Sequence, residues 1–436
     1  HQAAIANRWD EAQAHWKITV ETDRSSFRLA YNLALAYEQG GNYLAAAEAW
    51  REALRRRPRR ADHPDALDDE QIARLWQHTA EIYRKANLPE DAIKVYQQAI
   101  KRDPDNISLR LALSENLLAV GRIQAAQNEL ERILGRDPNH IPALLRMGET
   151  LFRSDQWWVR LTAPRYWERI LKLEADHMQA RQALADYYRN QAEIDYSWDR
   201  FSEAIKDYQD ALKYQPNHAF TLAAIANCHI RNGAPDSAQP YIDQALGLAP
   251  KDVRIFGEII GAWIQVGDYD RAWKFMRQAE AAIKPVPVEF YLTRAAQLLE
   301  MEQKEQAALW LDAAIEQALP DQPVLLMIGE MAMDYDDQLA RRYLEQAVAA
   351  GQAAGEAHLL LGILADKRGD KRARSRHWNE AERIARQTRD TELKERTTIA
   401  RLMAGGPQAM LERLLNMGGP EAVEDFLSFM EGESDE

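Results

Sequence analysis

The sequence has little of what disulfide-bonded, membrane-spanning or β-sheet proteins are built from. Cysteine occurs once in 436 residues, at Cys228, which excludes an internal disulfide and is compatible with a reducing compartment. No apolar run approaches the length of a membrane span, and the first residues do not resemble a signal peptide. Glycine and proline are modest at 20 and 17, and strand-type alternation is hard to find. We therefore expect an all-α, cytoplasmic protein, which leaves open a signal or an anchor upstream of residue 1.

The chain also lacks the short motifs that mark common catalytic and nucleotide sites. It contains no glycine-rich phosphate loop with the Lys-Ser/Thr ending, no Gly-x-Ser-x-Gly elbow, no His-Glu-x-x-His and no Cys-x-x-Cys. The net charge of −13 is unfavourable for binding nucleic-acid backbone, which rewards clustered lysine and arginine. We therefore predict no catalytic residue, no cofactor, no metal and no nucleic-acid partner.

What the sequence has instead is a repeating helical pattern, clearest over residues 73–106. Apolar residues recur there at three- and four-residue steps, first up to Tyr83 and again after a break at Asn87 and Pro89. Small and large side chains are combined within the two predicted helices, as in closely packed helix pairs. Pro104 ends the second helix, because proline disfavours the helical conformation in the residue before it. One such hairpin cannot bury its apolar faces alone, so the pattern predicts stacked neighbours.

The spacing of particular residues in this stretch is typical of a known family. The residues concerned are Trp76, Thr79, Ala80, Tyr83, Ala92, Tyr96, Ala99 and Pro104. At these positions the stretch closely resembles the tetratricopeptide repeat, a helix–turn–helix unit of about 34 residues. The resemblance covers residues 7–388 and implies a right-handed α-solenoid of about ten stacked repeats. It also implies a broad role, which is to hold other proteins.

The repeat divides the chain into three parts. Residues 1–26 resemble the second helix of a truncated repeat, which suggests a fragment of a longer protein or a processed form. Residues 27–388 hold the repeats, and residues 389–436 are predicted to form further helices and an acidic tail. We interpret the end as a helical cap for the solenoid. The alternative is a Met-rich amphipathic segment that docks in a groove, its own or a partner's, which would allow self-association.

The repeat pattern is interrupted by insertions near residues 59–70, 155–162 and 190–200. The first is rich in arginine and aspartate, which fits either an acidic-partner site or, as we favour, a solvated helix end with self-neutralising charges. The other two carry Trp157, Trp158 and Trp198. These aromatics would anchor a partner if they are exposed, and would pack on one another if the insertions only lengthen the helices.

Three histidines, His140, His177 and His218, stand at equivalent turns of successive repeats. Equivalent positions in stacked hairpins should lie at least ~10 Å apart, whereas two histidines on one zinc each need a bond of about 2 Å. We therefore interpret them as turn residues near helix starts.

The family resemblance also implies where a ligand would lie. In these repeats the first helix lines the concave face, with its second, fifth, sixth and ninth positions pointing into the groove. The candidate partner-binding residues are Arg28, Tyr31, Asn32, Arg74, Gln77, Glu81, Glu115, Glu149 and Asn227, together with the insertion residues Trp157, Trp158 and Trp198. Members that bind acidic chaperone tails use lysine and asparagine at the fifth and ninth positions, and this clamp is absent here.

The leading hypothesis is a non-catalytic protein–protein interaction scaffold, or adaptor, that binds a partner protein or an extended peptide in the concave groove. The alternative is a regulatory or substrate-recruiting arm of a longer enzyme whose catalytic domain lies upstream of residue 1. A third possibility is self-assembly, in which the C-terminal helices of one copy dock in the groove of another.

Overall fold

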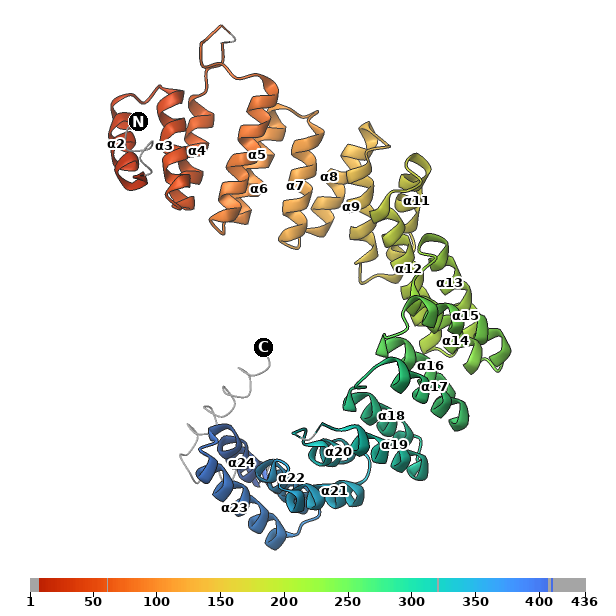
Figure 1. Cartoon of the computed structure of the whole chain (residues 1–436). Helices are drawn as coiled ribbons and strands as arrows, with labels where there is room; N and C mark the ends of the chain where they lie inside the picture. Colours follow the sequence, from red (N-terminus) through yellow and green to blue (C-terminus); the bar gives the residue numbers. More distant parts are fainter. Residues whose placement is uncertain (1–7, 61, 320, 407–408, 411–436) are drawn as a thin grey trace. The chain divides into compact units, whose positions relative to one another are not determined.

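The computed structural model describes residues 8–60, 62–319, 321–406 and 409–410, and every regular element within them is a helix (Figure 1). The chain divides into two compact units. Unit 1 comprises His1–Gln191 and Asp210–Pro216, and unit 2 comprises Ala192–Gln209 and Asn217–Glu436. The predicted all-α solenoid of stacked helical hairpins is confirmed within each unit, since successive helices pack on one another over residues 9–152 of unit 1 and over residues 219–282 and 288–403 of unit 2.

The helices of unit 1 are α2 (Trp9–Thr22), α3 (Phe27–Gln39), α4 (Tyr43–Arg56), α5 (Asp69–Lys85), α6 (Pro89–Arg102), α7 (Ile107–Ala119), α8 (Ile123–Arg136), α9 (Ile141–Phe152), α10 (Trp157–Arg160) and α11 (Pro164–Leu173). The unit boundary passes through α12 (Met178–Ser197) and α13 (Phe201–Tyr214). Unit 2 continues with α14 (Ala219–Arg231), α15 (Pro235–Leu248), α16 (Val253–Gln265), α17 (Tyr269–Ala282), α18 (Val288–Glu300), α19 (Lys304–Gln317), α20 (Val324–Ala332), α21 (Asp337–Ala350), α22 (Ala354–Lys367), α23 (Lys371–Thr388) and α24 (Thr391–Met403).

The hairpin α5–α6 packs as its sequence predicts. Ala80, Ala92 and Ala99 are fully buried at the helix contact, and the rings of Trp76 and Tyr83 fill the space beside them. Small residues allow the helix backbones to approach, and large ones restore the packing density around them. The same small-residue positions are buried in the second helices of both units, at Ala46, Ala53, Ala126, Ala238, Ala245, Ala272, Ala279, Ala307, Ala314, Ala340, Ala347 and Ala381.

The three histidines at the repeat turns begin helices. Nδ1 of His140, His177 and His218 each accepts a hydrogen bond of 3.2 Å from the backbone N–H three residues later. This is the N-cap arrangement, which satisfies one of the donors left free at a helix start. The interpretation of these histidines as turn residues is confirmed.

The inserted segments take three different forms. The described residues of the connection between α4 and α5, 57–60 and 62–68, form no helix and stand out from the neighbouring hairpins (Figure 1). The second insertion forms the short helix α10, whereas the third extends α12 to 20 residues, compared with 13 in α14.

At the far end of unit 2, α24 covers the last hairpin. Leu393 and Ala404 join Leu359 and Trp378 in one apolar cluster, so α24 buries a face that α22 and α23 would otherwise expose. The later predicted C-terminal helices and the acidic tail fall on residues 411–436, outside the described residues.

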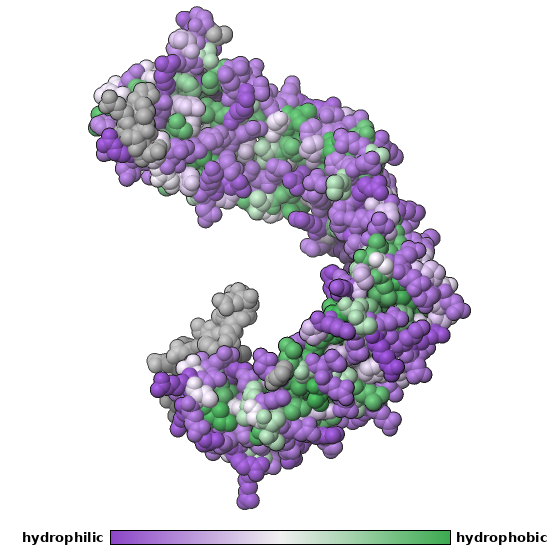
Figure 2. Space-filling view, viewed as in Figure 1, coloured by the Kyte–Doolittle hydropathy of each residue, from purple (hydrophilic) through white to green (hydrophobic). Residues whose placement is uncertain are grey.

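The surface is mostly hydrophilic, with apolar side chains visible in patches between helices on the face that Figure 2 shows. Among the described residues, no helix combines the length and apolar composition needed to cross a membrane.

Candidate partner-binding groove

Three adjoining pockets follow the first helices of the unit 1 hairpins. The aromatic pocket, about 420 Å³, lies between α3 and α5, and the middle pocket, about 570 Å³, continues from α5 to α7. These two share Arg74 and His78 in their walls. The turn pocket, about 780 Å³, lies between α7, α8 and α9 and shares Glu115 with the middle pocket. Neighbouring pockets share wall residues, and we call this row of three pockets the unit 1 groove.

The aromatic pocket is built around a chain of rings from three successive helices. Tyr31 on α3 meets Trp50 on α4 edge to face at 4.7 Å, and Trp50 meets His78 on α5 at 4.9 Å. Trp50 is only 1% exposed, whereas Tyr31 is 38% exposed, so Tyr31 presents its ring to the pocket from a rigid support. Edge-to-face contacts of this kind stabilise aromatic pairs by about 0.5–1.5 kcal/mol beyond burial.

The middle pocket has polar walls from α5, α6 and α7. Glu81 is paired with Arg84 at 2.6 Å, and the hydrogen bonds from this arginine lower the pKa of the Glu81 carboxyl. Burial raises the pKa of Tyr96 to about 12, with the nearby Glu81 and Glu115 adding to the effect. The Tyr96 phenol is therefore protonated at neutral pH and keeps its capacity to donate a hydrogen bond.

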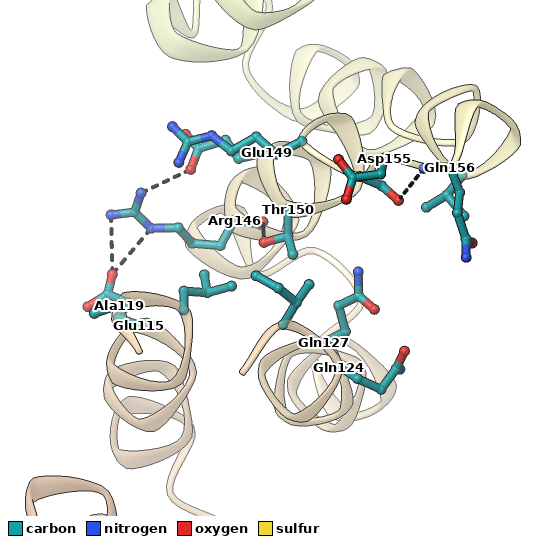
Figure 3. A pocket seen from close by; sticks show the side chains of 14 residues that line it. Glu115, Ala119, Gln124, Gln127, Arg146, Glu149, Thr150, Asp155 and Gln156 are labelled. Carbon is teal, nitrogen blue, oxygen red and sulfur yellow. Dashed lines mark hydrogen bonds and ion pairs between the residues drawn. The ribbon is translucent and has the colours of Figure 1, made fainter. Parts of the chain in front are cut away.

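A charged triad lies at one side of the turn pocket (Figure 3). Arg146 on α9 reaches between Glu149, at 3.0 Å, and Glu115 on α7, at 3.3 Å. Burial acts to lower the pKa of Arg146, but the hydrogen bonds that it donates to Glu149 and Glu115, with the charges of these carboxylates, raise it overall. The triad fixes α9 against α7 and leaves one carboxylate charge in excess at the pocket wall.

The second insertion borders the turn pocket and carries two tryptophans that do not line it. Gln156 and Val159 line the pocket, and Trp157 and Trp158 lie between them in the sequence. The two indoles meet edge to face at 5.9 Å and remain 62% and 55% exposed. The sequence left open whether these rings are exposed or pack on each other. In the structure they contact each other and remain exposed, and their role in partner binding stays a prediction.

Comparison with protein-family models gives the family. Models described as tetratricopeptide repeat match residues 5–62, 83–147 and 199–257. The chain contains tetratricopeptide repeats. Repeats of this family generally mediate protein–protein interaction, so a protein partner is the expected ligand of a tetratricopeptide groove. No curated protein matches the chain.

Solved structures of tetratricopeptide repeat proteins show low similarity to the chain. A tetratricopeptide repeat protein from Parabacteroides merdae is 15% identical, covers 68% of this chain and 95% of its own, and has a TM-score of 0.34. The C-terminal part of a repeat-containing protein from Cytophaga hutchinsonii is 14% identical over 59% of this chain and 96% of its own, with a TM-score of 0.41. MamA from Desulfovibrio magneticus is 17% identical over 40% of this chain and 94% of its own, with a TM-score of 0.31.

The tetratricopeptide positions chosen from the sequence lie in several environments. Lining the unit 1 groove are Tyr31, Arg74, Gln77, Glu81, Glu115 and Glu149. Arg28 instead pairs at 2.6 Å with Asp65 and so ties the first insertion to α3, and Asn32 is half-buried on α3. The aspartate of the arginine-rich insertion is therefore paired with a helix outside it.

Two predicted residues belong to unit 2. Trp198 is 73% exposed just after α12. Asn227 is only 4% exposed, accepts a hydrogen bond from Tyr196 and donates one of 2.6 Å to Glu258. Its amide is therefore engaged within unit 2.

Sequence reasoning missed Glu38 and Trp50, which both line the aromatic pocket. Trp50 stands at a core position of a second helix, and Glu38 lies near the end of α3, beyond the family's groove positions. No pattern in the sequence distinguishes them from core and surface residues.

Proposed function

We propose that the chain is a non-catalytic scaffold whose unit 1 groove binds an extended peptide segment of a partner protein. The observation that carries the proposal is the row of three adjoining pockets along α3, α5, α7 and α9, with two exposed tryptophans in the short helix that borders the last pocket. Exposed aromatic side chains on a rigid support are the residues in which binding energy concentrates.

The polar groups along the groove suit a peptide backbone. Gln77 lines the middle pocket, and Gln127 and Gln156 line the turn pocket. Within the part of the chain that the structure describes, no side-chain hydrogen bond engages these three amides. Each amide can both donate and accept, which is what the N–H and C=O groups of an extended peptide require.

The proposal rests on the residues that line the groove and on Trp157 and Trp158. Arg28, Asn32 and Trp198 lie outside the lining of these pockets, and Asn227 is buried, so none of them supports groove binding.

The direct test is selection of a random dodecapeptide library on the full chain, followed by fluorescence anisotropy with each selected peptide. Replacing Trp157 and Trp158 by alanine should weaken binding by about tenfold or more, because two exposed aromatic anchors are lost. The matched control is Leu173→Ala, an apolar side chain 43% exposed on α11 outside the pocket walls, which should leave binding unchanged. Failure to select any peptide, or equal binding by both variants, would contradict groove binding.

A further inference from the structure

The aromatic pocket holds a carboxylate that pairs with no lysine or arginine among the described residues. Oε2 of Glu38 accepts a hydrogen bond of 2.9 Å from Nε1 of Trp50 and lies 2.8 Å from Nε2 of His78. Because an ionised carboxylate only accepts hydrogen bonds, this histidine nitrogen carries the proton. The Glu38 side chain is 14% exposed and lines the pocket, so its remaining acceptor capacity faces the space where a ligand would enter.

The arginines closest to this pocket are paired with other carboxylates. Arg74, in the pocket wall, lies 3.4 Å from Glu70, and Arg28 on α3 lies 2.6 Å from Asp65. Among the described residues, no lysine or arginine nitrogen comes within 4.0 Å of Glu38. The indole of Trp50 and the imidazole of His78 fix the position of the Glu38 carboxylate, and the negative charge of this carboxylate stays available to a ligand.

A peptide that covers the pocket removes the remaining water from Glu38. A carboxylate taken out of water destabilises a complex unless a cation or further donors compensate it. A guanidinium or an ammonium supplies both charge and N–H groups, and charge-assisted hydrogen bonds are about twice as strong as neutral ones. An apolar or acidic side chain at this place would leave the charge uncompensated or repel it.

The walls of the pocket also suit a long cationic side chain. The exposed ring of Tyr31 can face a cation, an interaction of about 0.5–2 kcal/mol. Leu35 and Leu67 offer apolar contact for the aliphatic stem that lysine and arginine share. Along the whole groove carboxylates outnumber guanidinium groups: the lining residues are Glu38, Glu81, Glu115, Glu149 and Asp155 against Arg74, Arg146 and Arg153.

We propose that the aromatic pocket binds a lysine or arginine side chain of the partner peptide, with Glu38 as its counter-ion and Tyr31 as its aromatic wall. The inference rests on the proposed function, because it concerns one side-chain position of a peptide bound in the unit 1 groove. It makes the partner segment basic at that position, which is the opposite of the acidic tails bound by the Lys/Asn clamp.

The test uses the same random dodecapeptide library on the full chain, with Glu38→Gln as the variant. Glutamine keeps an oxygen that accepts from Trp50 and His78 but carries no charge. The wild type should enrich lysine or arginine at one fixed peptide position, and Glu38→Gln should abolish that enrichment. Replacing the enriched arginine by citrulline, its neutral isostere, should weaken binding to the wild type about 10- to 100-fold and leave binding to Glu38→Gln little changed.

Two further variants keep the test decisive if Glu38→Gln proves poorly folded. Leu35→Lys supplies a cation from the chain itself at a side chain that is already 38% exposed, and should also abolish the enrichment. Glu48→Gln on the exposed face of α4 is the control and should retain it. Selection of peptides without a fixed basic position, or enrichment that survives Glu38→Gln and Leu35→Lys, overturns the inference while the proposed function stands. Selection of no peptide overturns both.

Discussion

Replacing Gly148 by alanine has two opposite effects on the stability of unit 1, a gain in helix propensity and a loss from overpacking. The structure shows which of the two is larger. Gly148 lies inside α9, where alanine would ordinarily stabilise a helix by about 1 kcal/mol. A Cβ atom at this position would lie 2.4 Å from Nε1 and 2.6 Å from Cε2 of Trp167. Carbon atoms pack at about 3.5–4.0 Å, so the ring or the helix would have to move by about 1 Å. Trp167 is 1% exposed and has no free space to move into.

Overpacking of this kind costs about 1–3 kcal/mol, and a contact this short against a buried ring belongs near the upper limit. After subtracting the propensity gain, we expect Gly148→Ala to lower the free energy of unfolding of unit 1 by about 1–2 kcal/mol. For a unit of this size the melting temperature should fall by about 2–8 °C.

The matched control is Gly135→Ala near the end of α8, where a Cβ atom would meet nothing within 4 Å. This variant should be more stable than the wild type by up to about 1 kcal/mol. Differential scanning calorimetry of both variants measures the pair. The packing argument is refuted if Gly148→Ala melts at or above the wild-type temperature while Gly135→Ala behaves as expected.

Three other predictions follow from buried groups. Arg110→Met should destabilise unit 1 by about 3 kcal/mol in urea unfolding, the lower end of the range for breaking a buried ion pair, because it leaves the carboxylate of Glu129 with only its exposed partner Arg132. Arg110 contacts Glu129 at 2.5 Å, and the two side chains are 8% and 12% exposed. Arg132→Met removes the 62% exposed partner of the same carboxylate and should cost less than about 1 kcal/mol. Burial lowers the pKa of His358 and of His377, whose Nδ1 atoms lie 3.0 Å apart. The stability that these neutral imidazoles give unit 2 is therefore full above the unfolded pKa of 6.5 and is lost as pH falls below it. The loss of melting temperature between about pH 7 and pH 5 should be smaller in His358→Gln/His377→Gln than in the wild type, and an unchanged loss would argue against the pair. Burial raises the pKa of the Cys228 thiol to about 12, so an aromatic disulfide reagent should label it at least about 100-fold more slowly in the folded chain than in urea, and equal rates would contradict its burial.

Much of the fold follows from the sequence because the repeat encodes it locally. The spacing of Trp76, Tyr83, Ala92 and Ala99 predicts two helices and the contact between them, and the structure buries all four side chains at that contact. Each hairpin needs only its neighbours, so a pattern that is correct for one repeat extends to the stack.

The groove is less predictable, because its chemistry depends on contacts between repeats. Position in the first helix identified Tyr31 and Gln77, but it also selected Asn227, which Tyr196 and Glu258 engage from neighbouring helices. Glu38 acquires its place only because Trp50 and a histidine of the following hairpin donate to it. Such a pairing depends on residues 12 and 40 positions away in the sequence, and no local pattern reveals it.

The central claim is that a peptide lies in the unit 1 groove, and site-specific photocrosslinking tests it most directly. A photoreactive phenylalanine derivative would replace Gln77 in the middle pocket or Gln98, an exposed residue of α6 outside the groove. With a selected peptide bound, we expect a covalent adduct from position 77 and none above background from position 98. Adducts from position 98 alone, or equal yields from both positions, would contradict binding in the groove.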